Sequence, residues 1–135
     1  MDGVTLTPLN KVLHPKGNIY HAMKKSDVGF GGFGEADFSN IFVNCIKGWK
    51  KHSEMTLNLI VPVGEIKFVI YDEKSKCFFS VNLSNKNYQR LTVKPNLWLA
   101  FQGISESSML LNIANMEHDP NESETIELTS ISYEW

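Results

Sequence analysis

The sequence lacks the features that mark several large classes of protein. No apolar run approaches the roughly 20 residues of a membrane-spanning helix, so we expect no membrane partner and a cytoplasmic location. A formal net charge of −2 offers no basic surface for nucleic acid. Only two cysteines occur, Cys45 and Cys77, without C-x-x-C spacing. We predict that both are buried free thiols in a reducing compartment.

Helical periodicity is also missing, whereas strand patterns are frequent. Residues 56–63 and 65–72 alternate between apolar and other side chains, and a turn at Gly64 separates them. Similar short segments recur as far as residue 135, with turn residues every 8–12 positions or so. No window of about a dozen residues carries a convincing 3.6-residue period. The sequence therefore predicts an all-β jelly-roll barrel of about nine or ten strands.

The length of 135 residues favours one domain with a core of its own. We predict an N-terminal arm over residues 1–24 and a barrel over residues 25–135. The apolar arm and the long edge strands would leave backbone groups unpaired in a monomer. Pairing across a two-fold axis would satisfy them, so we expect a homodimer.

Histidine is too scattered to indicate a metal site. The four histidines are His14, His21, His52 and His118. Metal sites in small β-barrels typically use a His-x-His pair followed by Glu, and the chain has no such pair. We therefore expect no metal and no other cofactor, although two histidines meeting Glu35 would make a metal-dependent enzyme the third alternative.

Proton transfer is the chemistry that the polar residues favour. His52 stands at the start of a predicted strand, close to Lys50. A histidine can remove a carbon-bound proton when a neighbouring cation stabilises the enolate that forms. We expect His52 to be the base, Lys50 or Lys67 to hold the enolate, and Tyr71 or His118 to be the acid.

A ligand site is expected at the polar mouth of the barrel. This expectation assumes that the polar strand faces line the lumen and that the apolar alternates, such as Leu57 and Phe68, point away. A shift of one residue would reverse the assignment. The predicted substrate-binding residues are Trp49, Asn58, Lys67, Trp98, Gln102 and Asn112.

Three segments resemble a known family. Residues 59–72 (LIVPVGEIKFVIYD), residues 81–95 (VNLSNKNYQRLTVKP) and the ending at residues 131–135 (ISYEW) are similar to the dTDP-4-dehydrorhamnose 3,5-epimerases. More specifically, the chain resembles a short branch of epimerase-like proteins from bacterial surface-polysaccharide gene clusters. The resemblance implies a cupin fold, that is, a double-stranded β-helix. It also implies a nucleotide-sugar substrate and proton transfer through an enolate.

The catalytic motifs of that family are altered in this chain. The Arg-Gly-x-His-aromatic-Gln motif reads KGWKKH at residues 47–52, so Lys50 occupies the place of the base and His52 that of Gln. The second-half His is absent from residues 98–101, and only Glu127 is near the place of the Asp that orients the base. Two functions remain open: an isomerase of 4-keto-6-deoxy nucleotide sugars, as epimerase or ketoisomerase, and a non-catalytic cupin that binds a sugar nucleotide or glycan.

Overall fold

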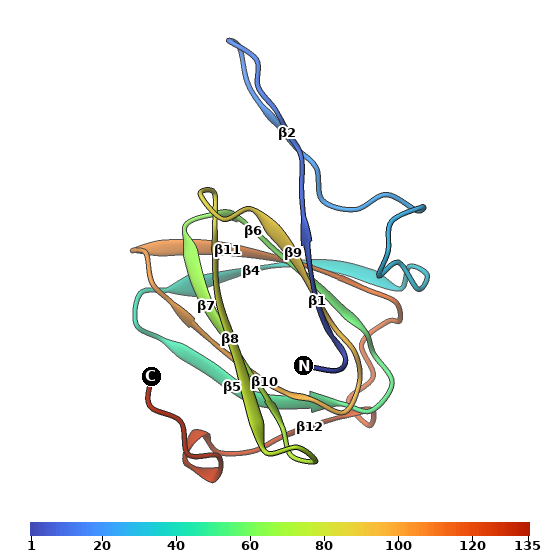
Figure 1. Ribbon diagram of the computed structural model, residues 1–135, viewed down its shortest axis with the longest axis vertical. Coiled ribbons are helices and arrows are strands. Elements are labelled where there is room, and N and C mark those ends of the chain that lie inside the picture. The colour runs from blue at the N-terminus through green and yellow to red at the C-terminus, as the bar shows by residue number, and fades with distance from the viewer.

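Two five-stranded antiparallel sheets face each other and form a barrel in the computed structural model, which describes residues 1–135 (Figure 1). The only helical element is a 3-10 turn, Leu128–Ser130. The predicted all-β cupin fold is therefore confirmed. The strands are β1 (Val4–Pro8), β2 (Lys11–Val12), β3 (Ile19–Tyr20), β4 (Glu35–Phe42), β5 (Ile46–His52), β6 (Leu57–Val63), β7 (Glu65–Asp72), β8 (Cys77–Ser84), β9 (Gln89–Val93), β10 (Trp98–Gly103), β11 (Ser107–Ala114) and β12 (Ser123–Thr125).

The strand order explains which segments meet across the barrel. One sheet has the order β1-β9-β6-β11-β4, and the other has the order β12-β5-β10-β7-β8. β1 pairs with β9 from Val4↔Val93 to Pro8↔Gln89, so this part of the predicted arm is a strand of the sheet. The β2–β3 hairpin pairs only with itself and projects away from the barrel (Figure 1). The division at residue 24 stays a prediction.

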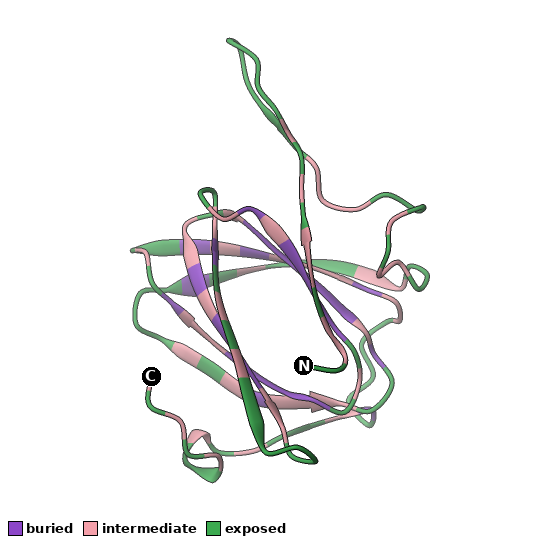
Figure 2. Ribbon diagram, in the orientation of Figure 1, coloured by how far each residue is buried: buried purple, intermediate pink, exposed green.

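The interior between the two sheets is apolar. Leu57 and Leu59 of β6 and Phe68 and Ile70 of β7 belong to one buried cluster, and each is at most 7% exposed. Figure 2 shows buried positions alternating with exposed ones along several strands. The prediction that polar strand faces line the lumen is wrong. The alternation was read correctly, but burying apolar area stabilises the fold, so the apolar faces of both sheets turn inward.

Segment 21–34 covers part of the outer face of the first sheet. Arg90 of β9 is fully buried there, and its guanidinium donates hydrogen bonds to the carbonyls of Ala22 (2.8 Å) and Val28 (2.9 Å). It also pairs with the carboxylate of Asp27 at 3.3 Å. Asn58 of β6 donates from its side-chain amide to the carbonyl of Gly29 at 3.1 Å. Polar residues of the outer face thus fasten the preceding segment to the sheet.

The two cysteines are free and exposed, so the prediction of buried thiols is wrong. Cys45 lies in the connection between β4 and β5, next to Asn44, whose φ is 63°. Cys77 is the first residue of β8, directly after a turn. Both lie at strand ends, where the inward face of the sheet no longer encloses the side chain. No helix in the structure is long and apolar enough to cross a membrane.

Candidate functional site

A cavity of about 380 Å³ lies between the two sheets. Its lining combines apolar walls with a small set of polar and charged side chains, which is the usual composition of a ligand site. The lining residues are Ser39, Lys47, Gly48, Lys50, His52, Leu57, Leu59, Leu99, Phe101, Leu110, Asn112 and Thr125.

A bulge in β5 brings Lys47 and Lys50 into the same cavity. Leu99 pairs with Lys50 and Phe101 pairs with Lys47, so Ala100 of β10 stands opposite two residues of β5. The extra residue reverses the alternation, which otherwise would place residues 47 and 50 on opposite faces. Gly48 allows this geometry because its φ is 141° and a Cβ there would lie 2.5 Å from the Cβ of Ala100.

The cavity carries uncompensated positive charge. Neither Lys47 nor Lys50 forms an ion pair, although both line the cavity. Lys51, by contrast, points to the other face and pairs with Glu73 at 2.7 Å and with Glu124 at 3.3 Å. Lys47 is exposed and Lys50 is partly buried, and their two ammonium groups at the cavity favour an anionic ligand because opposite charges attract.

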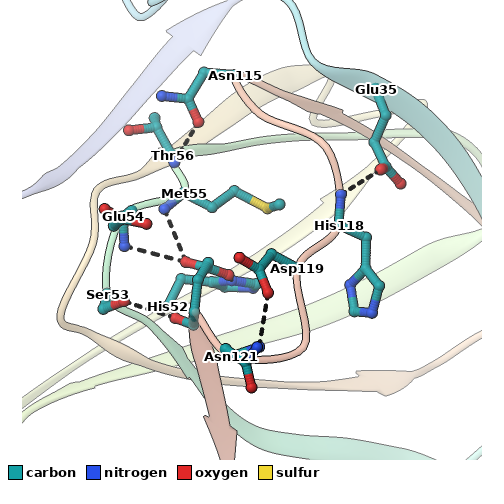
Figure 3. Close-up of polar contacts among 11 residues, drawn as sticks. Glu35, His52, Ser53, Glu54, Met55, Thr56, Asn115, His118, Asp119 and Asn121 are labelled. Atoms are coloured by element: carbon teal, nitrogen blue, oxygen red, sulfur yellow. Dashed lines mark hydrogen bonds and ion pairs between the residues drawn. The ribbon is translucent and has the colours of Figure 1, made fainter.

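His52 forms a buried pair with Glu122, a residue that precedes β12. The Nδ1 atom of His52 contacts Oε1 of Glu122, and the two side chains are 12% and 3% exposed. The other carboxylate oxygen accepts hydrogen bonds from the amides of Glu54 (3.1 Å) and Met55 (3.0 Å), within the turn drawn in Figure 3. With Nδ1 occupied, Nε2 is the ring nitrogen left for a ligand, an arrangement typical of an oriented general base.

The carboxylate of Glu122 is held in its charged form. Burial by itself would raise the pKa of Glu122, but hydrogen bonds from His52 and from the amides of Met55 and Glu54 outweigh that effect. The pKa of Glu122 therefore lies below its usual value of 4.5. A charged Glu122 accepts a hydrogen bond from Nδ1–H of His52, so Nε2 is the ring nitrogen that can exchange a proton with a ligand.

The cavity wall opposite β5 carries no charged side chain. It consists of apolar side chains from β6 and β11, together with Ser39 of β4 and Asn112 of β11. The side-chain oxygen of Asn112 accepts a hydrogen bond from the backbone amide of Asn58 at 3.2 Å. Its amide nitrogen has no partner in the protein and can donate to a ligand.

Three of the ten predicted site residues meet in this cavity: Lys50, His52 and Asn112. The other seven do not line it: six of them project from strands, and His118 lies in a loop. Asn58 lies on the outer face of the first sheet, where Thr92 donates to its side-chain oxygen at 2.7 Å. Gln102 donates to the carbonyl of Asn44 at 3.4 Å and is also outside the cavity.

The remaining four of those six lie on the outer face of the second sheet. Trp49 is fully buried there and donates to the carbonyl of Leu128 at 3.2 Å. Tyr71 packs on Phe78, and Lys67 and Trp98 each form a cation–π contact with other residues of that face. The physical reason is the same for all six: the inward faces of the strands are the apolar ones, so their polar alternates point outward.

His118 lies outside the cavity, in the loop between β11 and β12. Its backbone amide donates to Glu35 at 2.6 Å, and its ring points away from His52 (Figure 3). Neither Tyr71 nor His118 therefore faces a ligand in the cavity, and the acid predicted from the sequence is not among the lining residues.

Two residues of the site were missed in the sequence. Lys47 was noted in the motif but not chosen, and strict alternation would place it on the face opposite Lys50. The partner of His52 is Glu122, not Glu127, and it is 70 positions distant in sequence. The only signal was the polar run at residues 117–124. No group of three or more His, Cys, Asp and Glu side chains is placed to hold a metal ion.

Comparison with solved structures gives close matches over nearly the whole chain. A dTDP sugar isomerase from Desulfovibrio desulfuricans G20 is 29% identical, with a TM-score of 0.94, and the match covers 99% of this chain and 91% of that one. A variant of the 3,4-ketoisomerase QdtA from Thermoanaerobacterium thermosaccharolyticum, in complex with TDP-4-keto-6-deoxyglucose, has a TM-score of 0.81 at 17% identity, covering 92% and 88%. The 3,5-epimerase RmlC from Legionella pneumophila has a TM-score of 0.86 at 15% identity, covering 100% and 79%.

The matches below 25% identity show a common fold. No curated protein sequence matches the chain. The family model FdtA, described as WxcM-like, C-terminal, matches residues 2–126. Together with the cupin barrel and the structural relatives, which are epimerases and isomerases of nucleotide sugars, this match establishes that the chain belongs to the FdtA (WxcM-like, C-terminal) family of epimerase-like cupins.

Proposed function

We propose that the protein is an isomerase of nucleotide-linked 4-keto-6-deoxy sugars in bacterial polysaccharide biosynthesis. The observation that carries this proposal is the His52–Glu122 pair beside two unpaired lysines in a cavity of about 380 Å³. The pair supplies an oriented base, and the lysines supply positive charge for a diphosphate and for an enolate oxygen. The pairing also removes one argument for a non-catalytic binder, namely that the histidine lacks a carboxylate partner.

In the proposed reaction, Nε2 of His52 removes a proton from a carbon next to the C4 ketone. The electron pair of the broken C–H bond forms the enolate, whose oxygen lies against the ammonium group of Lys50. Lys47 binds the diphosphate. A proton returned to carbon completes the isomerisation, and neither an oxidant nor a metal is required, because only protons move.

The position of the charged groups favours a ketoisomerase over an epimerase. Lys47, Lys50 and His52, the titratable residues that line the cavity, all come from β5, on one wall. On the facing sheet, Asp37 of β4 pairs with Asn112, which lines the cavity, but neither Asp37 nor Glu35 is itself a lining residue. Inversion of a carbon centre needs a base and an acid on opposite faces of the sugar. A single wall of proton carriers instead returns the proton to the face from which it came.

Same-face transfer has a defined product. When the hydrogen of C3 moves to C4 and the hydroxyl proton of O3 moves to O4, the ketone moves from C4 to C3. In 4-keto-6-deoxyglucose, hydrogen delivered to C4 from the face that C3 lost gives the galacto configuration. An inverted C3 or C5 centre would instead indicate an epimerase with an acid on the facing wall.

The relatives support this choice of substrate. The structural match with 29% identity is a dTDP sugar isomerase, and the match extends over 99% of this chain. Two further matches are complexes with TDP-4-keto-6-deoxyglucose and with dTDP-4-keto-L-rhamnose. These ligands belong to those proteins, and they define the substrate panel for this one. A gene neighbourhood with a sugar-nucleotide dehydratase, aminotransferase or glycosyltransferase would support the proposed pathway.

The experiment is solvent exchange. The protein is incubated in D₂O with dTDP-4-keto-6-deoxyglucose and with other 4-keto-6-deoxy nucleotide sugars, and NMR follows deuterium at C3, C4 and C5. We expect incorporation that is lost in His52→Ala and retained in His118→Ala, because His118 lies outside the cavity. Binding of these sugars without exchange would contradict catalysis and support the non-catalytic cupin.

We further propose a cytoplasmic homodimer.

A further inference from the structure

The inner face of β4 runs from the core of the barrel to its surface. Ile41 is 1% exposed and belongs to the buried cluster, and Ser39 lines the cavity. Side chains two positions apart in a strand share a face, so Asp37 continues this row. The register agrees, because Asp37 pairs with Asn112, another lining residue, and directly opposed residues project to the same side. Asp37 is exposed, so it stands at the rim of the cavity, on the wall that faces β5.

Glu35 holds the carboxyl group of Asp37 at this rim. The carboxyl groups of Glu35 and Asp37 hydrogen-bond to each other, and this contact raises the pKa of Asp37 above its usual value of 3.8 and lowers the pKa of Glu35 from 4.5. Glu35 also accepts a hydrogen bond from the backbone amide of His118 at 2.6 Å, which favours its charged form (Figure 3). Of the two carboxyl groups, Asp37 therefore holds a proton more readily.

The proposed isomerisation moves two hydrogens, and the lining residues account for one of them. Nε2 of His52 carries the carbon-bound hydrogen from C3 to C4. The hydroxyl proton must still move from O3 to O4, whereas Lys47 and Lys50 bind the diphosphate and the enolate oxygen. This second transfer needs a group that donates to one oxygen and accepts from its neighbour. A protonated carboxyl group does both, because one of its oxygens carries a proton and the other has free lone pairs.

We infer that Asp37 carries the hydroxyl proton between O3 and O4, an inference that rests on the proposed isomerase function. Once the enolate has formed, protonated Asp37 gives its proton to O4, and its second oxygen takes the proton of O3. The electron pair of the O3–H bond then forms the C3 carbonyl, and the pair of the C3=C4 double bond takes the hydrogen from His52 at C4. Asp37 ends protonated, as it began. The carbon-bound hydrogen stays with His52, so Asp37 does not alter the face to which C4 is protonated.

The experiment separates exchange at carbon from isomerisation. The unaltered protein and Asp37→Asn are incubated in D₂O with dTDP-4-keto-6-deoxyglucose, and NMR follows deuterium at C3 of the remaining substrate and the formation of 3-keto product. Asn has nearly the shape of Asp but cannot carry the proton. We expect Asp37→Asn to retain exchange at C3, because His52 and Lys50 are unchanged, and to form product about 10²- to 10⁴-fold more slowly. His52→Ala should lose both.

Asp119→Asn is the matched control, because the carboxylate of Asp119 accepts a hydrogen bond from the amide of Asn121 at 2.9 Å within the neighbouring loop. It should match the unaltered protein in exchange and in product formation. Circular dichroism checks that each variant is folded, which is expected for Asp37→Asn because Asp37 is exposed.

The outcomes distinguish this inference from the proposed function. Normal product formation by Asp37→Asn, or loss of exchange together with product, would overturn the inference and leave the proposed function standing. Inversion at C3 or C5 that is lost in Asp37→Asn would make Asp37 the acid of an epimerase and would also overturn it. An unaltered protein with neither exchange nor product would overturn the proposed function, and the inference with it.

Discussion

At the residue level, the cavity depends on contacts between residues that are distant in the sequence. His52 and Glu122 come from β5 and from the loop before β12, and Asn58 and Asn112 come from β6 and β11. His52 was singled out in the sequence, but only the fold brings Glu122 to it. The role of a polar side chain here depends on the face of the strand from which it projects.

Glu122→Gln should slow catalysis with little effect on the fold. The Gln side chain can still accept from the amides of Glu54 and Met55, but it no longer holds His52 with a negative charge. We expect the deuterium-exchange rate to fall by about 10²- to 10⁴-fold, the range associated with a misoriented or absent general base. Glu124→Gln is the matched control, because Glu124 pairs with Lys51 outside the cavity. Equal rates in the two variants would contradict the role given to Glu122.

Asn58→Ala should destabilise the fold while leaving the exchange rate of the folded protein nearly unchanged. Asn58 is 3% exposed, accepts from Thr92 and donates to Gly29, so its loss leaves buried polar groups unpaired. We expect the free energy of unfolding, measured in urea, to fall by about 1–3 kcal/mol, with nearly normal exchange in the folded protein. Asn82→Ala removes an exposed hydrogen bond to Glu65 and should cost under about 0.5 kcal/mol. Loss of substrate binding with normal stability would restore the ligand role predicted from the sequence.

At the level of single elements, β5 carries most of the candidate chemistry. Its bulge opposite Ala100 places Lys47, Lys50 and His52 on one wall, while Trp49 and Lys51 take the outer face. Regular pairing would have turned Lys47 away. The strand therefore combines two functions, because its outer side chains anchor the C-terminal segment and its inner ones form the site.

Gly48→Ala should disturb both functions of β5. The new Cβ would lie 2.5 Å from the Cβ of Ala100 and 2.7 Å from its Cα, at a φ of 141° that favours glycine. We expect a loss of about 1–3 kcal/mol of unfolding free energy, together with slower exchange as the two lysines shift. Gly31→Ala is the control, since its Cβ would meet only an amide nitrogen at 4.0 Å. A variant as stable and active as the unaltered protein would argue against a tight bulge.

At the level of the whole molecule, two covering segments complete the barrel. Segment 21–34 lies on the outer face of the first sheet, and residues 126–135 pack on the outer face of the second, around Trp49. The loop that carries Glu122 links the two sheets, because it is tied to the β5–β6 turn and leads into β12. Ionised carboxylates hold several of these connections, which makes the fold sensitive to acid.

Acidification should therefore destabilise the protein, with a measurable share from Glu122. Its folded-state pKa is lowered from 4.5, so the unfolded chain binds the proton more readily. The stabilisation that Glu122 contributes is fully present above the pKa that its carboxyl has in the unfolded chain. It is lost as the pH falls through the lower pKa of the folded protein. We expect the free energy of unfolding to decline between about pH 6 and about pH 3. Glu122→Gln should decline less over that range, and an identical decline would contradict the assignment.

The sequence determined the fold class and the location of most strands. Alternation at residues 56–63 and 65–72 was sufficient for two central strands, because strand geometry imposes a period of two whatever the tertiary context. His52 and Lys50 were also found from the sequence, because a histidine beside a cation suits proton transfer, although His52 ends strand β5 instead of beginning a strand. The family resemblance correctly indicated an epimerase-like cupin.

Only the tertiary structure decided which face of each strand lines the cavity and which distant residues meet there. Alternation defines two faces but not which one is enclosed, and a single bulge at Gly48 changes which face of β5 Lys47 shares with Lys50. Glu122 reaches His52 because a loop folds back across the barrel, which no local pattern encodes. Strand formation is governed by neighbouring residues, whereas the chemistry of the site depends on packing between the two sheets.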